Sequence, residues 1–174
     1  MTDDRIAALE RRLAEVEDRL ALLQIVAAYG PAVDSGSAEA TAALWTEDGV
    51  YDTFPVVLAG KAAIAGMVTG ELHQGLINSG AAHLIGIPHI ELAGDTAVVT
   101  TYSQLVLRDN ETDSYRSWRT GVNRWEFART PQGWRVTRRV NRQLDGTPEG
   151  RAILGAAVTA SDSRGYGHGS RVGG

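Results

Sequence analysis

The side chains best suited to proton transfer in this sequence are its four histidines, His73, His83, His89 and His168. Imidazole gains and loses a proton near neutral pH. A carboxylate bonded to one ring nitrogen fixes the tautomer and leaves the other nitrogen free to act as a base. With a tyrosine hydroxyl as donor, such a base supports β-elimination, isomerisation or aldol-type cyclisation, none of which requires a cofactor.

Other kinds of site are disfavoured by residue type and spacing. The chain has no cysteine, which excludes disulfides, thiolate catalysis and cysteine-bound zinc or iron–sulfur clusters. The histidines form neither an H-x-x-x-H pair nor a facial triad with a carboxylate. No serine lies in a nucleophile-elbow motif, and no glycine run resembles a phosphate loop. We therefore expect chemistry without a metal or a cofactor.

The four histidines differ in their local settings. His83 lies on a predicted strand, where it faces either a pocket or the core. His89 shares the strand parity of His83, but Pro88 precedes it and favours an edge position. We expect His73, in a glycine-containing stretch, to be solvent-exposed, and His168 to lie in a flexible tail.

Length and charge restrict the class of protein. The chain has 174 residues, a mass of 18.6 kDa and a net charge of −4, which suits one domain. It has no basic block for nucleic acid. The charged start, MTDDRIAALERR, is unlike a signal peptide, and no apolar run reaches the roughly 18 residues of a membrane span. We therefore expect a cytoplasmic protein that binds neither nucleic acid nor membranes.

Residues 1–29 are predicted to form a helix. Apolar residues recur there at alternating spacings of three and four, as at the a and d positions of a heptad repeat. These residues are Ile6, Leu9, Leu13, Val16, Leu20 and Leu23. Gly30 and Pro31 are expected to break or kink the helix after Tyr29. The apolar seam is too short for an autonomous coiled coil and favours a lid or a subunit contact.

The remaining elements follow from changes in periodicity. Helices are expected over residues 34–48 and 61–70, with a strand at 50–54 that ends at Pro55. Strands with a period of two come next, and tight turns join them into an antiparallel meander. These strands span residues 82–92, 96–107, 114–128 and 133–143. Residues 155–174, rich in Gly and Ser, are expected to form a flexible tail.

Helices followed by a long meander predict an α+β fold. We expect a single domain over residues 1–154, a cone-shaped α+β barrel in which the N-terminal helices pack in a strongly curved antiparallel sheet. Such a sheet encloses an apolar cavity that suits a small-molecule substrate. Val- and Trp-rich strands such as 114–128 would leave apolar area uncovered in a monomer, so we expect a homodimer or a homotrimer.

Four segments carry a family resemblance: the run YGPAVDSGSAEATAALWTEDGVYD, the Gly60-Lys61 turn, the segment AAHLIGIPHIEL and the closing GWRVTRR. Together they are similar to the SnoaL-like branch of the nuclear transport factor 2-like (NTF2-like) superfamily, over about residues 5–145. The resemblance implies the same cone-shaped fold. It does not specify the reaction, because this fold hosts many chemistries as well as plain binding proteins.

Within this superfamily the sequence most resembles scytalone dehydratase and γ-hexachlorocyclohexane dehydrochlorinase, which use an Asp–His pair to abstract a proton. Matched residue by residue, their aspartate falls on Asp34 and their histidine on His83. The resemblance therefore implies that these two residues form the catalytic base. On local sequence alone, Asp34 could instead cap a helix or make a turn.

Further pocket residues are expected around this pair. The expected substrate-binding residues are Tyr29, Tyr51, Phe54, Tyr102, Trp118, Asn123 and Arg139. The resemblance places a basic pocket residue at Arg139 or at its neighbour Arg138. The second catalytic histidine of scytalone dehydratase is replaced here by Trp118 or Arg119, which argues against the scytalone reaction itself.

Two functions are compatible with these residues. The first is a cofactor-independent dehydratase, isomerase or cyclase that acts on a mostly apolar polyketide-like, steroid-like or aromatic ring compound. The second is a non-catalytic ligand-binding or assembly module, such as the β-subunit of ring-hydroxylating dioxygenases. The presence of both Asp34 and His83 favours the enzyme, because a structural subunit has no need of the pair.

Overall fold

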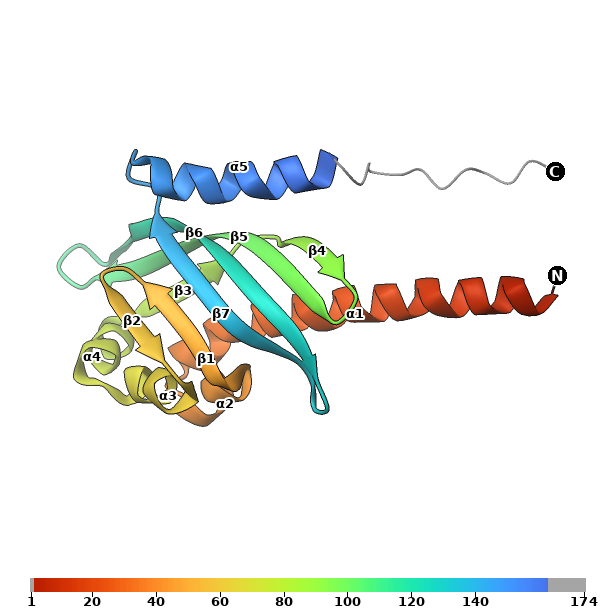
Figure 1. The fold of residues 1–174 in the computed structure, drawn as a ribbon. Coiled ribbons are helices and arrows are strands. Elements are labelled where there is room, and N and C mark those ends of the chain that lie inside the picture. The colour runs from red at the N-terminus through yellow and green to blue at the C-terminus, as the bar shows by residue number, and fades with distance from the viewer. Residues whose placement is uncertain (1, 163–174) are drawn as a thin grey trace.

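The structure, a computed structural model, describes residues 2–162, which form five helices and a seven-stranded sheet (Figure 1). The helices are α1 (Thr2–Asp34), α2 (Ala38–Ala43), α3 (Lys61–Thr69), α4 (Glu71–Ser79) and α5 (Pro148–Asp162). The strands are β1 (Trp45–Thr53), β2 (Val56–Ala59), β3 (Ala81–Ile85), β4 (His89–Ala93), β5 (Thr96–Asp109), β6 (Ser114–Thr130) and β7 (Gly133–Gln143). The predicted cone-shaped α+β fold is confirmed, although the curved sheet does not close on itself.

Strand pairing in the sheet includes one parallel pair. The order is β2-β1-β7-β6-β5-β3, and β4 pairs with β5. β1 runs parallel to β7, with Tyr51 opposite Arg139, whereas the other pairs are antiparallel. The expected antiparallel sheet is therefore wrong at this pair. β1 precedes the meander and reaches β7 through a long crossover, which permits the parallel direction that a tight hairpin forbids.

The strand expected over residues 82–92 is divided in two. β3 pairs with residues 103–107 of β5, and β4 pairs with residues 96–100. Between them, Gly86 donates its N–H to the Tyr102 carbonyl at 2.9 Å. Pro88 has no N–H to offer to the ladder, so regular pairing resumes only at His89.

The first helix extends further than predicted. α1 runs through Gly30 and Pro31 to Asp34 instead of ending at Tyr29. Proline at this position removes one backbone hydrogen bond. The turn around it buries Tyr29 and Val33 completely in the core, and this burial offsets the lost bond.

The next elements also differ from the sequence prediction. The helix expected over residues 34–48 is reduced to α2, and residues 45–49 already belong to β1. The cause is Trp45, which is buried in the core and begins the pairing with β7 at Val136. The helix predicted over residues 61–70 is confirmed as α3, and the unassigned stretch after it forms α4.

The hydrophobic core lies between α1, α3 and the concave side of the sheet. Its largest members are Trp45, Trp125, Tyr29 and Phe127. α5 covers another side: in Figure 1 it lies above the sheet, whereas α2, α3 and α4 lie below it. Residues 155–162, predicted to begin a flexible tail, belong to α5, where Ala157 is buried. The rest of that predicted tail, including His168, lies outside the described residues.

The charged residues of α1 bear on the question of membrane insertion. Within residues 2–162, no helix combines the length and the apolar character needed to cross a membrane.

Gly30 permits the closest contact between α1 and the sheet. A Cβ atom at this position would lie 2.5 Å from the backbone carbonyl oxygen of His83. Real Cβ atoms essentially never come so near, and the obstacle is backbone, which cannot rotate away. The residue predicted to break the helix is therefore a packing glycine inside it, and it sets the distance between α1 and β3.

We expect Gly30→Ala to separate α1 from β3 and to lower the free energy of unfolding by about 1–3 kcal/mol, as overpacking does. The matched control is Gly66→Ala in α3, where an added Cβ meets nothing within 4 Å. That change should leave stability unaltered or raise it by up to about 1 kcal/mol. Urea denaturation of the two variants is the measurement, and equal unfolding free energies would contradict the packing role of Gly30.

Candidate active site

Asp34 and His83 meet at an edge of the sheet. Asp34 is the last residue of α1, and His83 is the central residue of β3, the end strand of the sheet. The ring nitrogen Nδ1 of His83 lies 2.5 Å from Asp34 Oδ1. The backbone N–H of His83 donates to Asp34 Oδ2 at 2.7 Å. One carboxylate therefore holds both the ring and the backbone of the histidine.

This contact assigns the tautomer of His83. Because a carboxylate only accepts hydrogen bonds, Nδ1 carries the proton and Nε2 of the neutral ring keeps its lone pair. The side chains of His83 and Asp34 are 20% and 23% exposed, so a ligand can reach the ring. The pair has the geometry of an imidazole base oriented by a carboxylate.

His73 also belongs to the site, and the prediction that it is solvent-exposed is wrong. Instead of being solvent-exposed, it is buried, and its ring stacks on that of His83 with centroids 5.7 Å apart. Its Nε2 lies 2.7 Å from the Val33 carbonyl oxygen and donates to it. The available signal was the spacing of His73, Leu76 and Ile77, which share one face of α4.

The buried guanidinium group of Arg139 lies near the Asp34–His83 pair. Arg139 is 3% exposed, and its Cζ lies over the rings of Tyr29, Trp125 and Tyr51, at 4.0, 4.1 and 4.6 Å from their centroids. Its Nε donates to Asn123 Oδ1 at 3.0 Å. Among the described residues Arg139 has no carboxylate partner, and its Nη1 is buried without a hydrogen bond.

The two tyrosines around Arg139 have opposite shifts in acidity. Burial raises the pKa of Tyr29 well above its usual value. Burial also acts to raise the pKa of Tyr51, but the charges of Arg139 and Arg119, with hydrogen bonds from Thr53 and Tyr29, outweigh it and lower that pKa. Tyr51 is therefore a stronger hydrogen-bond donor than an ordinary phenol.

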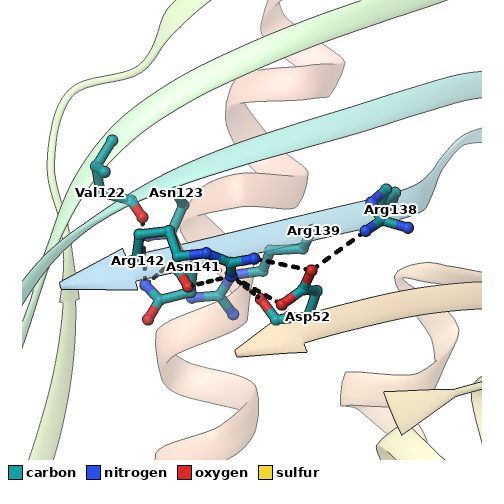
Figure 2. Close-up of polar contacts among 7 residues, drawn as sticks. All are labelled: Asp52, Val122, Asn123, Arg138, Arg139, Asn141 and Arg142. Atoms are coloured by element: carbon teal, nitrogen blue, oxygen red, sulfur yellow. Dashed lines mark hydrogen bonds and ion pairs between the residues drawn. The ribbon is translucent and has the colours of Figure 1, made fainter. Parts of the chain in front are cut away.

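The alternation of β7 decides which arginine faces inward. Figure 2 shows Arg139 pointing away from Asp52, whereas Arg138 and Arg142 converge on it. Arg142 binds the Asp52 carboxylate through two contacts of 2.8 and 3.0 Å, and Arg138 lies 3.2 Å from it. The basic residue of the interior is therefore Arg139, and Arg138 helps to join β7 to β1.

An apolar cavity of about 480 Å³ opens beside His83. Its polar groups include His83, His73, Tyr51 and Arg119, and most of the remaining lining is apolar. The apolar lining residues include Phe54, Pro55, Val56, Leu58, Met67, Leu72, Leu76, Leu105 and Trp118. A smaller hollow of about 20 Å³ is lined by both His83 and Arg139, so the two groups face a shared space.

A β-bulge brings both Trp118 and Arg119 to the cavity. In the β5–β6 ladder, Leu105 pairs with Arg119 and Val106 with Ser117, so Trp118 has no partner. Strict alternation would place Trp118 and Arg119 on opposite faces, but a bulge removes that restriction. The two residues between which the sequence could not choose therefore both line the cavity.

Two expected pocket residues lie elsewhere. Tyr102 is 55% exposed and lines a separate hollow, because the alternation of β5 turns its neighbours Thr101 and Ser103 inward instead. Asn123 is fully buried and lines none of the hollows described; it accepts hydrogen bonds from Arg139 and Asn141. Its role is to hold Arg139.

The site is built from imidazoles, phenols, guanidinium groups and the carboxylate of Asp34. In residues 2–162, no three His, Asp or Glu side chains are grouped so that they could hold a metal ion.

The family model of the SnoaL-like domain matches residues 14–140, and a search of curated proteins gave no match. The chain is similar to the crystal structure of an NTF2-like protein with a cystatin-like fold from Novosphingobium aromaticivorans. The two are 41% identical, with 84% of this chain and 94% of that chain covered and a TM-score of 0.81.

Two further solved structures share the fold. One is a protein from Novosphingobium aromaticivorans whose proposed activity is aromatic ring hydroxylation. It is 28% identical, with 74% of this chain and 90% of that chain covered and a TM-score of 0.62. The other is the protein Aln2 from a Streptomyces species, which is 18% identical, with 80% and 96% covered and a TM-score of 0.66.

The contact of Asp52 with Arg142 should make stability depend on pH. Hydrogen bonding to Arg142 is the main cause that lowers the pKa of Asp52. The ionised carboxylate therefore stabilises the fold above the ordinary aspartate pKa of about 4, and this stabilisation is lost as pH falls through the lowered value. At pH 7 we expect Asp52→Asn to lower the unfolding free energy by about 1–3 kcal/mol.

Denaturation of wild type and Asp52→Asn between pH 7 and pH 3 is the measurement, and their difference should shrink below about pH 4. Asp48→Asn is the control, since Asp48 is exposed on the same strand and forms no ion pair within the described residues. A difference between wild type and Asp52→Asn that stays constant with pH would show that the ion pair does not stabilise the β1–β7 contact.

Proposed function

The chain belongs to the SnoaL-like domain family of the NTF2-like superfamily, and from this premise we propose that it is a lyase or isomerase of small molecules. The observation that carries the proposal is the 2.5 Å contact of Asp34 with His83 Nδ1 beside an apolar cavity of about 480 Å³. The contact prepares Nε2 as a base, and the cavity has a size that small-molecule sites share.

In the proposed reaction, His83 Nε2 removes a proton from a carbon atom next to a carbonyl group. The imidazolium that forms is stabilised by the Asp34 carboxylate at Nδ1. His73, stacked on the ring and anchored to Val33, positions it. The electron pair released from the C–H bond moves toward the carbonyl oxygen and gives an enolate.

The enolate oxygen requires stabilisation of its negative charge. Tyr51 lines the cavity with a hydroxyl of lowered pKa, and Arg119 lies beside it. In an elimination, the carbonyl re-forms and the enolate electrons form a carbon–carbon double bond, while the β-hydroxyl group leaves with its bonding pair, takes the proton from the His83 imidazolium and departs as water. In an isomerisation, the imidazolium returns the proton to another carbon.

The cavity favours a mostly apolar substrate with its polar group at one end. Aliphatic and aromatic side chains from β2, α3, α4 and β6 form most of the wall, whereas His83, Tyr51 and Arg119 provide polar contacts. A ring compound of the polyketide-like, steroid-like or aromatic class fits this distribution. The proposed reaction uses no cofactor.

A second candidate function is a non-catalytic ligand-binding or assembly module. The likeness to a protein whose proposed activity is aromatic ring hydroxylation favours an aromatic ring as its ligand. In this alternative the cavity binds the ring without proton transfer. The two candidates differ in whether His83 is needed for turnover or only for binding.

The test is turnover of a panel of cyclic β-hydroxyketones and β,γ-unsaturated ketones, followed by the ultraviolet absorbance of the conjugated enone product. We expect His83→Ala and Asp34→Asn to lower kcat/KM roughly 10²- to 10⁴-fold, the usual range for a lost general base. His89→Ala is the control, because His89 on β4 lines none of the cavities described. Binding of panel compounds by the wild type without turnover would contradict the enzyme and favour the binding module.

Tyr51→Phe separates charge stabilisation from substrate binding. The change removes only the hydroxyl, so the ring contact with Arg139 is kept. We expect kcat to fall about 10- to 100-fold with little change in KM, because the hydrogen bond is needed most when charge develops. An unchanged kcat would exclude Tyr51 as the donor.

A further inference from the structure

The first two thirds of α1 carry an apolar stripe that the other described residues leave exposed. In Figure 1 the N-terminal part of this helix extends beyond the sheet. Six large apolar side chains along it are between 41% and 58% exposed. They are Ile6, Leu9, Leu13, Val16, Leu20 and Leu23. Their spacing is that of three successive pairs of a and d positions in a heptad repeat.

The side of α1 that faces its own fold is a different one. Leu22 and Val26 are fully buried. Asp18 accepts hydrogen bonds from Arg129 at 2.6 Å and from Trp134 Nε1 at 2.9 Å. Contacts within a single copy therefore anchor the helix from Asp18 onward. Because the fold already holds this helix, the association of a short seam does not have to offset the free-energy cost of helix nucleation.

Charges of opposite sign flank the two sides of the stripe. With Ile6 at an a position, the g positions hold Arg5, Arg12 and Arg19, and the e positions hold Glu10, Glu17 and Gln24. Arg19 is already engaged by Glu15 and the Ile90 carbonyl. Among the described residues, no ion pair or side-chain hydrogen bond involves the other four charged residues of this set.

The charge pattern selects one direction of pairing with a second copy. In a parallel coiled coil, a g residue faces the e residue five positions later in the partner helix. Arg5 would then face Glu10 of the second copy, and Arg12 would face Glu17. In an antiparallel arrangement, g faces g and e faces e, which places arginine against arginine and glutamate against glutamate.

We propose that α1 forms a parallel coiled coil with α1 of another copy of this chain, through the a and d residues from Ile6 to Leu23. Asp34 and His83 lie at the opposite end of α1 from this seam. The assembly therefore leaves the candidate site open in each copy, and the proposal is independent of the proposed reaction.

Sedimentation equilibrium of the full chain tests the association. We expect the wild type to have a multiple of the 18.6 kDa mass at micromolar concentration. Leu13→Glu should raise the dissociation constant by about tenfold or more, because it places a charge at a seam position. Leu13 is exposed, so the variant keeps its fold, which far-ultraviolet circular dichroism checks. Ile87→Glu, at an exposed apolar residue between β3 and β4 and outside the seam, is the control.

The absence of cysteine allows a direct test of direction. Equivalent d residues of a parallel coiled coil lie next to each other, so Leu9→Cys should form a disulfide-linked species under mild oxidation. In an antiparallel assembly, Leu9→Cys alone would not cross-link, but its mixture with Leu20→Cys would. A monomeric wild type, an assembly unaffected by Leu13→Glu, or cross-linking only in that mixture would each overturn the proposal.

Discussion

The structure depends on one buried cation. Arg139 on β7 lies among the rings of Tyr29 from α1, Tyr51 from β1 and Trp125 from β6. A guanidinium taken out of water without a carboxylate is costly, and aromatic faces together with the Asn123 hydrogen bond offset that cost. The contacts with Arg139 thus join the first helix to three strands. The charge of Arg139 acts to lower the pKa of both tyrosines, but burial outweighs it at Tyr29, whereas at Tyr51 the Thr53 hydrogen bond and the charge of Arg119 add to it and the pKa falls.

The same helix that packs on Arg139 delivers the carboxylate to the candidate base. Tyr29, Gly30, Val33 and Asp34 lie within the last two turns of α1, and each makes a different contact. Tyr29 stacks on Arg139, Gly30 allows contact with the backbone of β3, and Val33 offers its carbonyl to His73. Asp34 then meets His83. The position of the imidazole is consequently set by a helix, a strand edge and a second histidine, not by a mobile loop.

The two sides of the β1–β7 pair differ in whether their arginines have an acidic partner. On the outer side of the β1–β7 pair, Asp52 forms ion pairs with both Arg138 and Arg142. On the inner side, one residue away on each strand, Tyr51 and Arg139 face each other without an acid. An interior that holds the unpaired guanidinium of Arg139 near the imidazole of His83 is suited to reactions in which negative charge develops on an apolar substrate.

Local sequence patterns determined the class of most elements. The period of two predicted the strands from Thr96 to Gln143, and the three-and-four spacing predicted the apolar seam of α1. Residue types limited the chemistry to imidazole, carboxylate, phenol and guanidinium groups, and a resemblance selected Asp34 and His83 among them. These features depend on neighbours in the chain, which is why periodicity and composition can reveal them.

Contacts between segments far apart in the sequence decided the remaining features of the fold and of the candidate site. The continuation of α1 past Pro31, the parallel pairing of β1 with β7 and the burial of His73 each depend on groups far away in sequence. The inward position of Arg139 follows from the register of β7, and the place of Trp118 follows from a bulge. A local pattern specifies the type of an element, but its ends, register and neighbours are set by whichever non-local packing buries most apolar surface and pairs most polar groups.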